Sequence, residues 1–417
     1  MSNAAPLPRA ANRALLVLTA INLLNYLDRY LVPPLVTPLK GAMALSDEQV
    51  GWLWPAFMLV YMVTAPAFGA WGDRGSRRRP IALGVFIWSL ATVLSGFARS
   101  YPQLLGARAL VGIGEAAYVA IAPALLADCF PVSARGRVYS VLNMAIPVGA
   151  ALGYILGGLI GQHYGWRAAF FLCGAPGALL AAAVLAIPDP PRGVQEGAPP
   201  SAPSAERGSA FAGYLSLMRR APYMLVVLGY AAYTFGLGGL GFWMPVFLER
   251  VRGVAAQVAT RDFGEVVVVT GIVGTLVGGW LGDYCLKRSR QGYLWFAAIV
   301  TLAAVPCACV ALTAPEPRVY YPAIIAAELL LFMSTGPINA AIANIVSPLE
   351  RASAMALCMF LIHLLGDVPS PPLIGHLSDA SSLGRAVLVV PVAIAAGGLV
   401  WLASARAAAH RPLGAGA

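Results

Sequence analysis

The stretch "GAWGDRGSRRR", Gly69–Arg79, and the stretch "GWLGDYCLKRS", Gly279–Ser289, follow one pattern. Each reads G-x-x-G-D, continues into basic residues, and comes at the end of a long apolar run. "PVSAR" from Pro131 and "PLER" from Pro348 form a second such pair at corresponding later positions. Motifs that recur at this distance predict two related halves, a common construction of membrane transporters.

The composition of the chain places it in a membrane. It has 417 residues, of which 59% are hydrophobic and 11% are charged, and its mean hydropathy is +0.74. A soluble protein of this length could not cover so much apolar surface with so few polar residues. The net charge of +10 does not indicate a nucleic-acid partner, because the basic residues lie in short loops between apolar runs. We expect an all-α, polytopic membrane protein.

The apolar runs predict twelve membrane spans, since about 20 apolar residues cross about 30 Å of hydrocarbon. The predicted spans are 14–36, 50–72, 80–98, 102–127, 136–161, 168–187, 222–248, 264–284, 292–313, 320–346, 352–377 and 384–406. Between the sixth and seventh lies a segment rich in Pro, Gly, Ser and Ala, which cannot form a packed core. We therefore expect six-helix bundles at 1–187 and 222–417, joined by a linker at 188–221.

The orientation follows from the Lys and Arg residues of the connecting loops. They are concentrated in the loops on the side of the two termini, and this bias marks the cytoplasmic side of a membrane protein. Both termini are therefore expected in the cytoplasm. The first apolar run has no sensible cleavage site and contains Asp28 and Arg29, so it is expected to be retained as a span.

The Gly69–Arg79 stretch resembles the signature loop of the major facilitator superfamily, G-x-x-x-D-R-x-G-R-[RK]. The matching residues are Gly69, Asp73, Arg74, Arg77 and Arg78. Ser76 stands where the family has its second glycine, and a degenerate copy of the loop contains Asp283. The resemblance implies the major facilitator fold, with two pseudo-symmetric bundles of six helices.

A narrower resemblance is to the spinster family. It rests on "NYLDR", "RALVGIGEAAY", "AIPVGAALGYILGG", "FGLGGLGFWMP" and "HLLGDVPSPPLIG", which together span both halves. Spinster proteins transport sphingosine 1-phosphate or lysophospholipids in animals, and bacterial members share the fold. The resemblance implies a proton-coupled carrier of an amphiphilic anion, a monomer in the bacterial inner (plasma) membrane in contact with lipids, and not an enzyme. We expect no cofactor, with protons as the coupling ion.

Four charged residues within the predicted spans form the central site hypothesis. Asp28 and Arg29 lie near the middle of the first span, where a lone charge costs roughly 2.5–3.5 kcal/mol. Adjacent helical residues point about 100° apart, so each of the two needs a partner on another helix. Arg108 and Glu115 share one stripe of the fourth span, and Gly112 between them is expected to leave room for a guanidinium or a ligand. We expect Asp28, Arg29, Arg108 and Glu115 to form one cluster.

The chemistry of each side chain suggests its role. The planar fork of a guanidinium suits a phosphate or carboxylate head group, so Arg29 and Arg108 are predicted to bind substrate. Burial and neighbouring charges decide whether a carboxylate holds a proton, so Glu115 is predicted as the main proton carrier with Asp28 coupled to it. The alternative is a permanent salt-bridge network that only holds the two helices together.

The second half contributes further candidates. His363 and Asp367 are spaced i, i+4, and Asp367 is predicted either to share a proton with the histidine or to satisfy backbone broken by the prolines that follow. Tyr230, Tyr233 and Trp243 are predicted to line an apolar cavity for a lipid tail, although packing explains them too. Glu328 lies about eight residues from the outer end of its span and is expected to extend toward water.

The signature loop is predicted to act as a gate. Asp73 and the arginines beyond it would pair with helix ends across the boundary between the halves, on the cytoplasmic face. Gly69, Arg74, Arg77, Arg78 and Asp283 belong to this prediction, while topology alone also accounts for the arginines.

Two other functions stay open at this point. One is a proton-coupled carrier of small organic anions or drugs, and the other is an uncoupled lipid facilitator or scramblase. The sequence shows no nucleophile–base pair, no phosphate-cradling loop and no metal-ligand spacing, and the six cysteines do not indicate a metal site.

Overall fold

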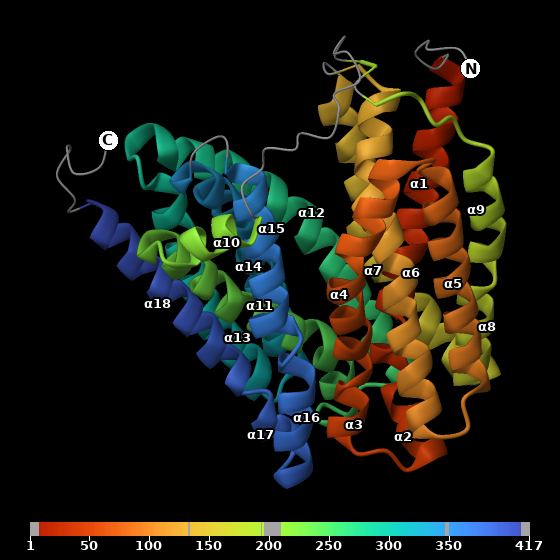
Figure 1. Cartoon of the computed structure of the whole chain (residues 1–417). Helices are drawn as coiled ribbons and strands as arrows, with labels where there is room; N and C mark the ends of the chain where they lie inside the picture. The colour runs from red at the N-terminus through yellow and green to blue at the C-terminus, as the bar shows by residue number, and fades with distance from the viewer. Residues whose placement is uncertain (1–7, 132–133, 193, 196–209, 347–349, 410–417) are drawn as a thin grey trace. The chain divides into compact units, whose positions relative to one another are not determined.

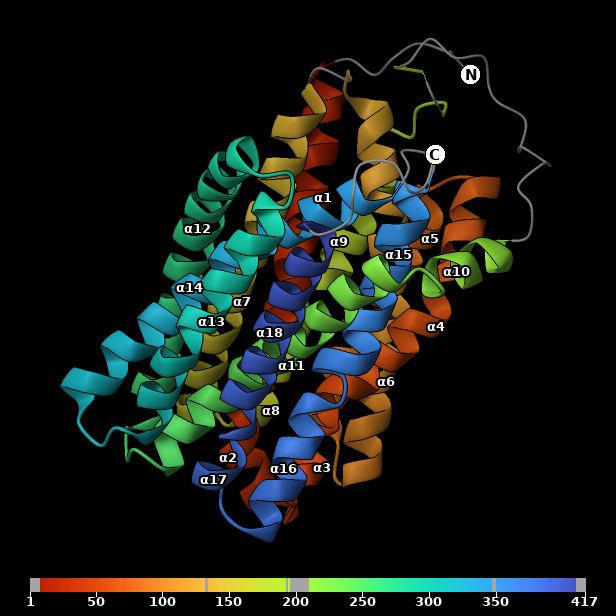
Figure 2. The ribbon, with the colours of Figure 1, turned by 90° about the vertical axis from the view of Figure 1, so that its left-hand side faces the viewer.

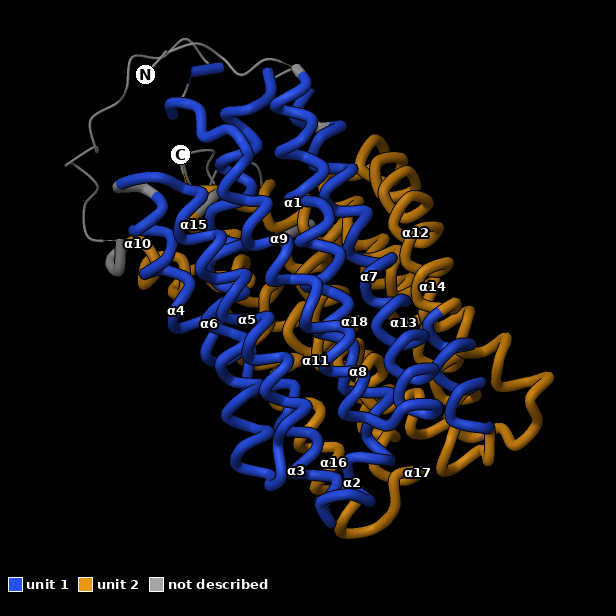
Figure 3. Tube along the Cα trace, turned by 90° about the vertical axis from the view of Figure 1, so that its right-hand side faces the viewer, with its two compact units in different colours: residues 1–205, 255–264 blue, residues 206–254, 265–417 orange. Residues whose placement is uncertain are grey.

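The computed structural model describes residues 8–131, 134–192, 194–195, 210–346 and 350–409 (Figure 1). Within these ranges the regular structure is helical throughout. In the described ranges, twelve helical segments are long and apolar enough to cross a membrane, as predicted. The chain divides into two compact units, residues 1–205 with 255–264, and residues 206–254 with 265–417 (Figure 3).

The first unit contains the first six spans. Its helices are α1 (Pro8–Arg29), the 3₁₀ turn η1 (Pro33–Leu35), α2 (Val36–Met43), α3 (Asp47–Gly51), α4 (Leu53–Arg74), α5 (Arg78–Phe97), α6 (Tyr101–Cys129), α7 (Arg135–Tyr164), α8 (Trp166–Gly174) and α9 (Pro176–Leu185). α6 packs against α4 and α5, α1 packs against α7, and α5 packs against α8 and α9.

The second unit contains the last six spans and repeats part of this arrangement. Its helices are α10 (Ala210–Met218), α11 (Ala221–Arg250), α12 (Ala256–Arg288), α13 (Gly292–Thr313), α14 (Pro317–Ile345), α15 (Arg351–Ile362), the π-helical turn η3 (His363–Asp367), α16 (Ser370–Ala380), α17 (Leu383–Ala386) and α18 (Val389–Ala409). The first part of α12, up to Gly264, belongs to the first unit, and the rest belongs to the second. α13 packs against α14 and α18, which Figure 2 labels together with α11. α11 packs against η3 and α18. The pair α5–α6 thus corresponds to α13–α14, which is the internal repeat that the two loop motifs predicted.

Glycines bring helices close together in the first unit. A Cβ atom added at Gly149 or Gly153 of α7 would lie 2.6 Å from the backbone oxygen of Leu23 or Leu27 on α1. A Cβ atom at Gly112 of α6 would lie 2.1 Å from the backbone oxygen of Phe57 on α4. The expectation that Gly112 leaves room for a ligand is therefore wrong, because backbone of α4 fills that space.

The first span is interrupted at its middle. α1 ends at Arg29, and the chain continues through η1 into α2 to complete a span over Arg9–Met43. Pro33 and Pro34 cause the interruption, because proline lacks an N–H group and disfavours the α conformation in the residue before it. The end of α1 therefore lies at the depth of the Asp28–Arg29 pair.

Candidate functional site

The four charged residues predicted to cluster do come together, and they form two ion pairs between the same two helices. Arg29 Nη2 donates to Glu115 Oε2 at 2.8 Å, and Arg108 Nη1 donates to Asp28 Oδ1 at 3.3 Å. All four belong to the first unit, two on α1 and two on α6. Adjacent residues of α1 thus pair with α6 residues two turns apart, as the 100° angle between neighbouring side chains requires.

In the Asp28–Arg108 pair both carboxylate oxygens of Asp28 are bound, whereas Arg108 Nε is buried without a hydrogen-bond partner among the described residues. Both side chains are 1% exposed, and the Thr92 hydroxyl donates to Asp28 Oδ2 at 2.6 Å. Arg108 Nη2 also lies 3.5 Å from the backbone oxygen of Asp28, at the interrupted end of α1. A cation at a helix C-terminus is favourable because the last carbonyl groups lack partners there. This pair therefore fixes the interruption of α1 as well as neutralising a buried charge.

The Arg29–Glu115 pair is incompletely satisfied. Glu115 is fully buried and Arg29 is 12% exposed, and a single hydrogen bond joins them. In the described part of the chain, Arg29 Nε and Glu115 Oε1 are buried without a hydrogen-bond partner. An unfilled donor and an unfilled acceptor at low dielectric are costly, so this pair can gain free energy by binding another polar group.

Aromatic rings surround the Arg29 guanidinium. Its central carbon lies 4.9 Å from the Tyr26 ring centroid and 5.1 Å from that of Phe57, and the Arg108 carbon lies 6.0 Å from the same Phe57 ring. Such cation–π contacts contribute roughly 0.5–2 kcal/mol each. Phe57 therefore contacts both guanidinium groups and helps to hold them in place.

Sequence reasoning missed the polar neighbours of this cluster. Asn25 is fully buried one turn before Asp28, and its amide atoms make no hydrogen bond within the described residues. Asn22, a further turn back, donates to the Leu142 carbonyl at 2.9 Å. The spacing of Asn22, Asn25 and Arg29 marks one face of α1, and this period could have identified both amides beforehand.

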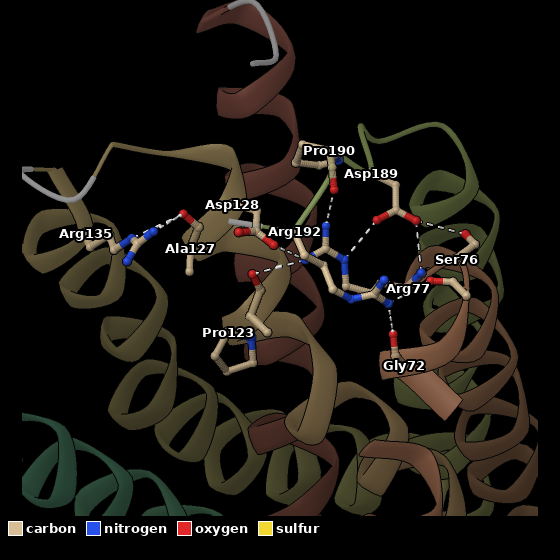
Figure 4. Close-up of polar contacts among 12 residues, drawn as sticks. Gly72, Ser76, Arg77, Pro123, Ala127, Asp128, Arg135, Asp189, Pro190 and Arg192 are labelled. Carbon is tan, nitrogen blue, oxygen red and sulfur yellow. Dashed lines mark hydrogen bonds and ion pairs between the residues drawn. The ribbon is translucent and has the colours of Figure 1, made fainter. Parts of the chain in front are cut away.

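Two of the predicted gate residues, Arg77 and Arg78, bond to groups of their own unit, and Figure 4 shows the contacts of Arg77. Arg77 is 3% exposed, and its side chain bonds to Asp128 at the end of α6, to Asp189 Oδ1 at 2.9 Å and to the Pro190 carbonyl. Arg78 donates to the Leu185 and Ile187 carbonyls, both at 3.1 Å. These bonds hold the signature loop to the ends of α6 and α9, and the expected role of the arginines in gating stays a prediction.

The first residues after α9 take part in this arrangement. Asp189 accepts from the Ser76 hydroxyl at 3.0 Å and from the Arg77 backbone N–H at 2.9 Å, and Arg192 binds the Gly72 and Gly75 carbonyls. Residues 188–221 were expected to form only a linker. Their composition gave no sign that Asp189 and Arg192 bind the signature loop between α4 and α5. The side chains of Asp73 and Arg74 lie outside the described residues.

The two remaining gate candidates differ from Arg77. Gly69 faces open space, since no atom lies within 4 Å of the point that a Cβ atom would occupy there. Asp283 is exposed and accepts from the Tyr293 hydroxyl at 2.6 Å. Neither observation tests a role in gating.

The predicted His363–Asp367 pair forms in the second unit. His363 Nδ1 lies 3.0 Å from each carboxylate oxygen of Asp367, and Asp367 is 8% exposed. The two residues begin and end the π-helical turn η3, where the Val368 N–H bonds to the His363 carbonyl at 3.0 Å. π-Helical turns occur frequently at functional sites.

The predicted tail-binding aromatics lie in the packed interior of the second unit. Tyr233 is 1% exposed and donates to the Leu331 carbonyl at 2.8 Å, and Trp243 is fully buried and donates to the Pro371 carbonyl at 3.0 Å. The Tyr233 hydroxyl and the Trp243 indole N–H both bond to backbone carbonyls. These two side chains are therefore packed in the interior and do not line an open cavity. Tyr230, 7% exposed and 3.5 Å from the Asn339 amide, keeps a weaker hydrogen bond.

Glu328 does not extend toward water. It is 2% exposed and faces a small cavity of about 10 Å³ with Leu240, Met244 and Leu312. The expectation that it reaches the membrane surface is wrong, because its side chain points into the helix bundle. Among the described residues no group of His, Cys, Asp and Glu could hold a metal ion.

Comparison with known proteins agrees with this architecture. A family model described as Major Facilitator Superfamily matches residues 18–367, so the twelve spans are those of a transporter and not of an enzyme. The chain is 32% identical to the sphingosine-1-phosphate transporter SPNS2 of Xenopus tropicalis over 95% of its own length and 82% of the relative's. It is 33% identical to protein spinster homolog 3 of Danio rerio over 93% of its length and 84% of the relative's. The chain therefore belongs to the spinster family of the major facilitator superfamily.

A solved structure shares the fold. It is a bacterial homolog to the human lysosomal transporter Spinster in an inward-facing and unoccupied conformation, with a TM-score of 0.87 and 24% sequence identity. The alignment covers 96% of this chain and 98% of that one.

Proposed function

We propose that this protein is a proton-coupled secondary transporter of an amphiphilic anion that works by alternating access. The observation that supports this most strongly is the buried Glu115 carboxylate, one oxygen of which has no hydrogen-bond partner among the described residues, whereas both oxygens of Asp28 are bound. Buried ion pairs are weak stabilisers compared with apolar packing, so a structural role alone poorly explains the second pair, Arg29–Glu115. Charged residues inside a span are by default candidates for an ion or substrate pathway.

The substrate class follows from the guanidinium and from the family. Arg29 has an unfilled Nε–H group, and a phosphate or carboxylate oxygen can bind a guanidinium through two parallel hydrogen bonds. One of the relatives named above is a sphingosine-1-phosphate transporter. We assign to this chain a lipid with one phosphate head group, such as a lysophospholipid or a sphingosine-phosphate-like molecule. Arg108 is bound to Asp28 and serves mainly to position α1.

Proton coupling follows from competition for Arg29. In this proposal the anion takes the Arg29 guanidinium over from Glu115, and the displaced carboxylate is fully buried. A buried, unpaired carboxylate is strongly disfavoured as an anion, so Glu115 takes up a proton when the substrate binds. By linkage, a proton on Glu115 releases Arg29 for the substrate. We assign a coupled role to Asp28 and a second proton position to the Asp367–His363 pair.

Alternating access is supported by the repeat of helix pairings in the two units, since transporters built from repeats move one half against the other. The bias of basic residues supports both termini in the cytoplasm, and we place the chain in the plasma membrane as a monomer.

A binding experiment tests the head-group assignment. Purified wild-type protein, Arg29→Gln and the control Arg167→Gln would be titrated with a fluorescent lysophosphatidic acid in neutral detergent. Arg167 donates to the Ala98 carbonyl away from the cluster, so its variant should bind like the wild type. We expect Arg29→Gln to bind at least roughly tenfold more weakly, the loss of a charge-assisted hydrogen bond. Equal binding by all three proteins would contradict the assignment, and equal binding of a short carboxylate without an acyl chain would favour a carrier of small organic anions.

A further inference from the structure

A second polar cavity lies at one end of the second unit, remote in sequence from the Asp28–Glu115 cluster. It has a volume of about 280 Å³ and is bounded by the start of α11, the α12–α13 turn, and the ends of α14 and α18. Its polar lining comes from Arg290, Gln291, Tyr293, Asn344 and Ser404. All of these residues belong to the second unit.

The lining offers donors for an anion. Arg290 is exposed, and within the described ranges its guanidinium forms no ion pair. α13 begins at Gly292, and the backbone N–H groups of Tyr293 and Leu294 in its first turn have no acceptor in the described structure. The first turn of a helix carries partial positive charge, which favours a bound anion.

The second observation is Ser404, on the opposite wall. Its side chain reaches the cavity from α18, it is only 5% exposed, and its hydroxyl has no hydrogen-bond partner among the described residues. Because this hydroxyl opens into the cavity and bonds to no other described group, it is available as a hydrogen-bond donor to a ligand. The cavity therefore combines one cation, free backbone donors and an unfilled hydroxyl.

The position of the cavity at the ends of the spans indicates which kind of anion it binds. Pro222 is the second residue of α11, Ile345 is the last residue of α14, and Ser404 lies three residues before the end of the span Leu383–Ala407. A cavity at the ends of four spans lies at the level of lipid head groups. Lys287 and Arg288 at the end of α12 add positive charge on this side.

The nearby acids do not fill the site. Asp283 is bound to the Tyr293 hydroxyl at 2.6 Å, and Glu350 is held by Arg220 through two hydrogen bonds of 2.8 and 2.6 Å. We propose that the cavity binds the phosphate head group of an anionic phospholipid, with Arg290, Ser404 and the first turn of α13 as its ligands. The apolar side chains of Leu294 and Ile345 face the start of the lipid's glycerol and acyl region.

The test compares short-chain phosphatidylglycerol with inorganic phosphate as the probe. Binding to full-length protein in neutral detergent would be measured by isothermal titration in an Arg29→Gln background, which removes the head-group site proposed above. The variants are Arg290→Gln and Ser404→Ala, with Arg406→Gln as the control, because Arg406 is exposed on α18 but does not line the cavity.

We expect saturable phosphatidylglycerol binding that weakens at least roughly tenfold in Arg290→Gln and severalfold in Ser404→Ala, while Arg406→Gln stays within about twofold. Inorganic phosphate should neither bind at the same concentration nor displace the lipid. Unchanged affinity in Arg290→Gln would overturn the site. Phosphate binding as tight as that of the lipid would overturn the assignment to a phospholipid.

Discussion

Removing Arg108 should destabilise the first unit severely, and the structure gives the size of the effect. Asp28 and Arg108 are each 1% exposed and lie 3.3 Å apart. Two unit charges at that distance attract by about 5 kcal/mol at an effective dielectric constant of about 20. In Arg108→Met the Asp28 carboxylate would keep only the Thr92 hydroxyl, and leaving a buried charge without its partner costs about 3–5 kcal/mol.

The double variant provides the control. Asp28→Asn combined with Arg108→Met removes both charges and keeps an oxygen that can accept from Thr92. It should therefore recover most of the lost free energy of unfolding. Thermal unfolding in detergent, followed by tryptophan fluorescence, should show a midpoint lowered on the order of 10 °C in the single variant. The reasoning would be refuted if Arg108→Met unfolded at the wild-type temperature. It would also be refuted if the double variant were no more stable than Arg108→Met.

Three further changes have expected outcomes. Gly112→Ala should lower the free energy of unfolding by about 1–3 kcal/mol or prevent folding, since its methyl group would overlap the backbone of Phe57, and circular dichroism melting measures this. Asp189→Asn should weaken the hold on Arg77, increase proteolytic cleavage just after α9 and leave the core intact; unchanged cleavage would count against that docking contact. Arg220→Gln should cost less than about 1 kcal/mol because its ion pair is exposed, and the difference should vanish near 1 M salt.

The stability contribution of the Arg220–Glu350 pair has a defined dependence on pH. The Glu350 carboxylate accepts hydrogen bonds from the Arg220 guanidinium, and these bonds raise the pKa of Arg220. The pair's contribution is therefore present below the ordinary pKa of the guanidinium and is lost only as the pH rises through the raised value. Wild-type and Arg220→Gln proteins should differ by the same amount at pH 7 and pH 9. A difference that disappears by pH 9 would contradict the assignment.

Much of the charged cluster could be predicted from the sequence. A charge within a span must find a partner on another helix, and the two adjacent charges of α1 had to face different residues. The partners of Arg77 could not be predicted in this way, because Asp128 and Asp189 lie in a helix end and a proline-rich segment whose composition carries no docking signal. Long-range contacts of this kind depend on tertiary packing, which no local pattern encodes.

Backbone geometry was harder to predict. The interruption of α1 was readable from Pro33 and Pro34, but the consequence, a free helix end beside Arg108, required the structure. The role of Gly112 was misjudged because an absent side chain serves equally as space for a ligand or as a contact for a helix. Only the position of Phe57 decides between them.

Proton-driven flux in proteoliposomes tests the central claim most directly. A labelled lysophospholipid would be followed under an imposed pH gradient with the wild type and with Glu115→Gln. We predict that the wild type concentrates the lipid against its gradient, whereas Glu115→Gln binds it but only brings the two sides to equal concentration. If both proteins merely equilibrate the lipid at similar rates, Glu115 does not carry the proton and the protein is an uncoupled facilitator.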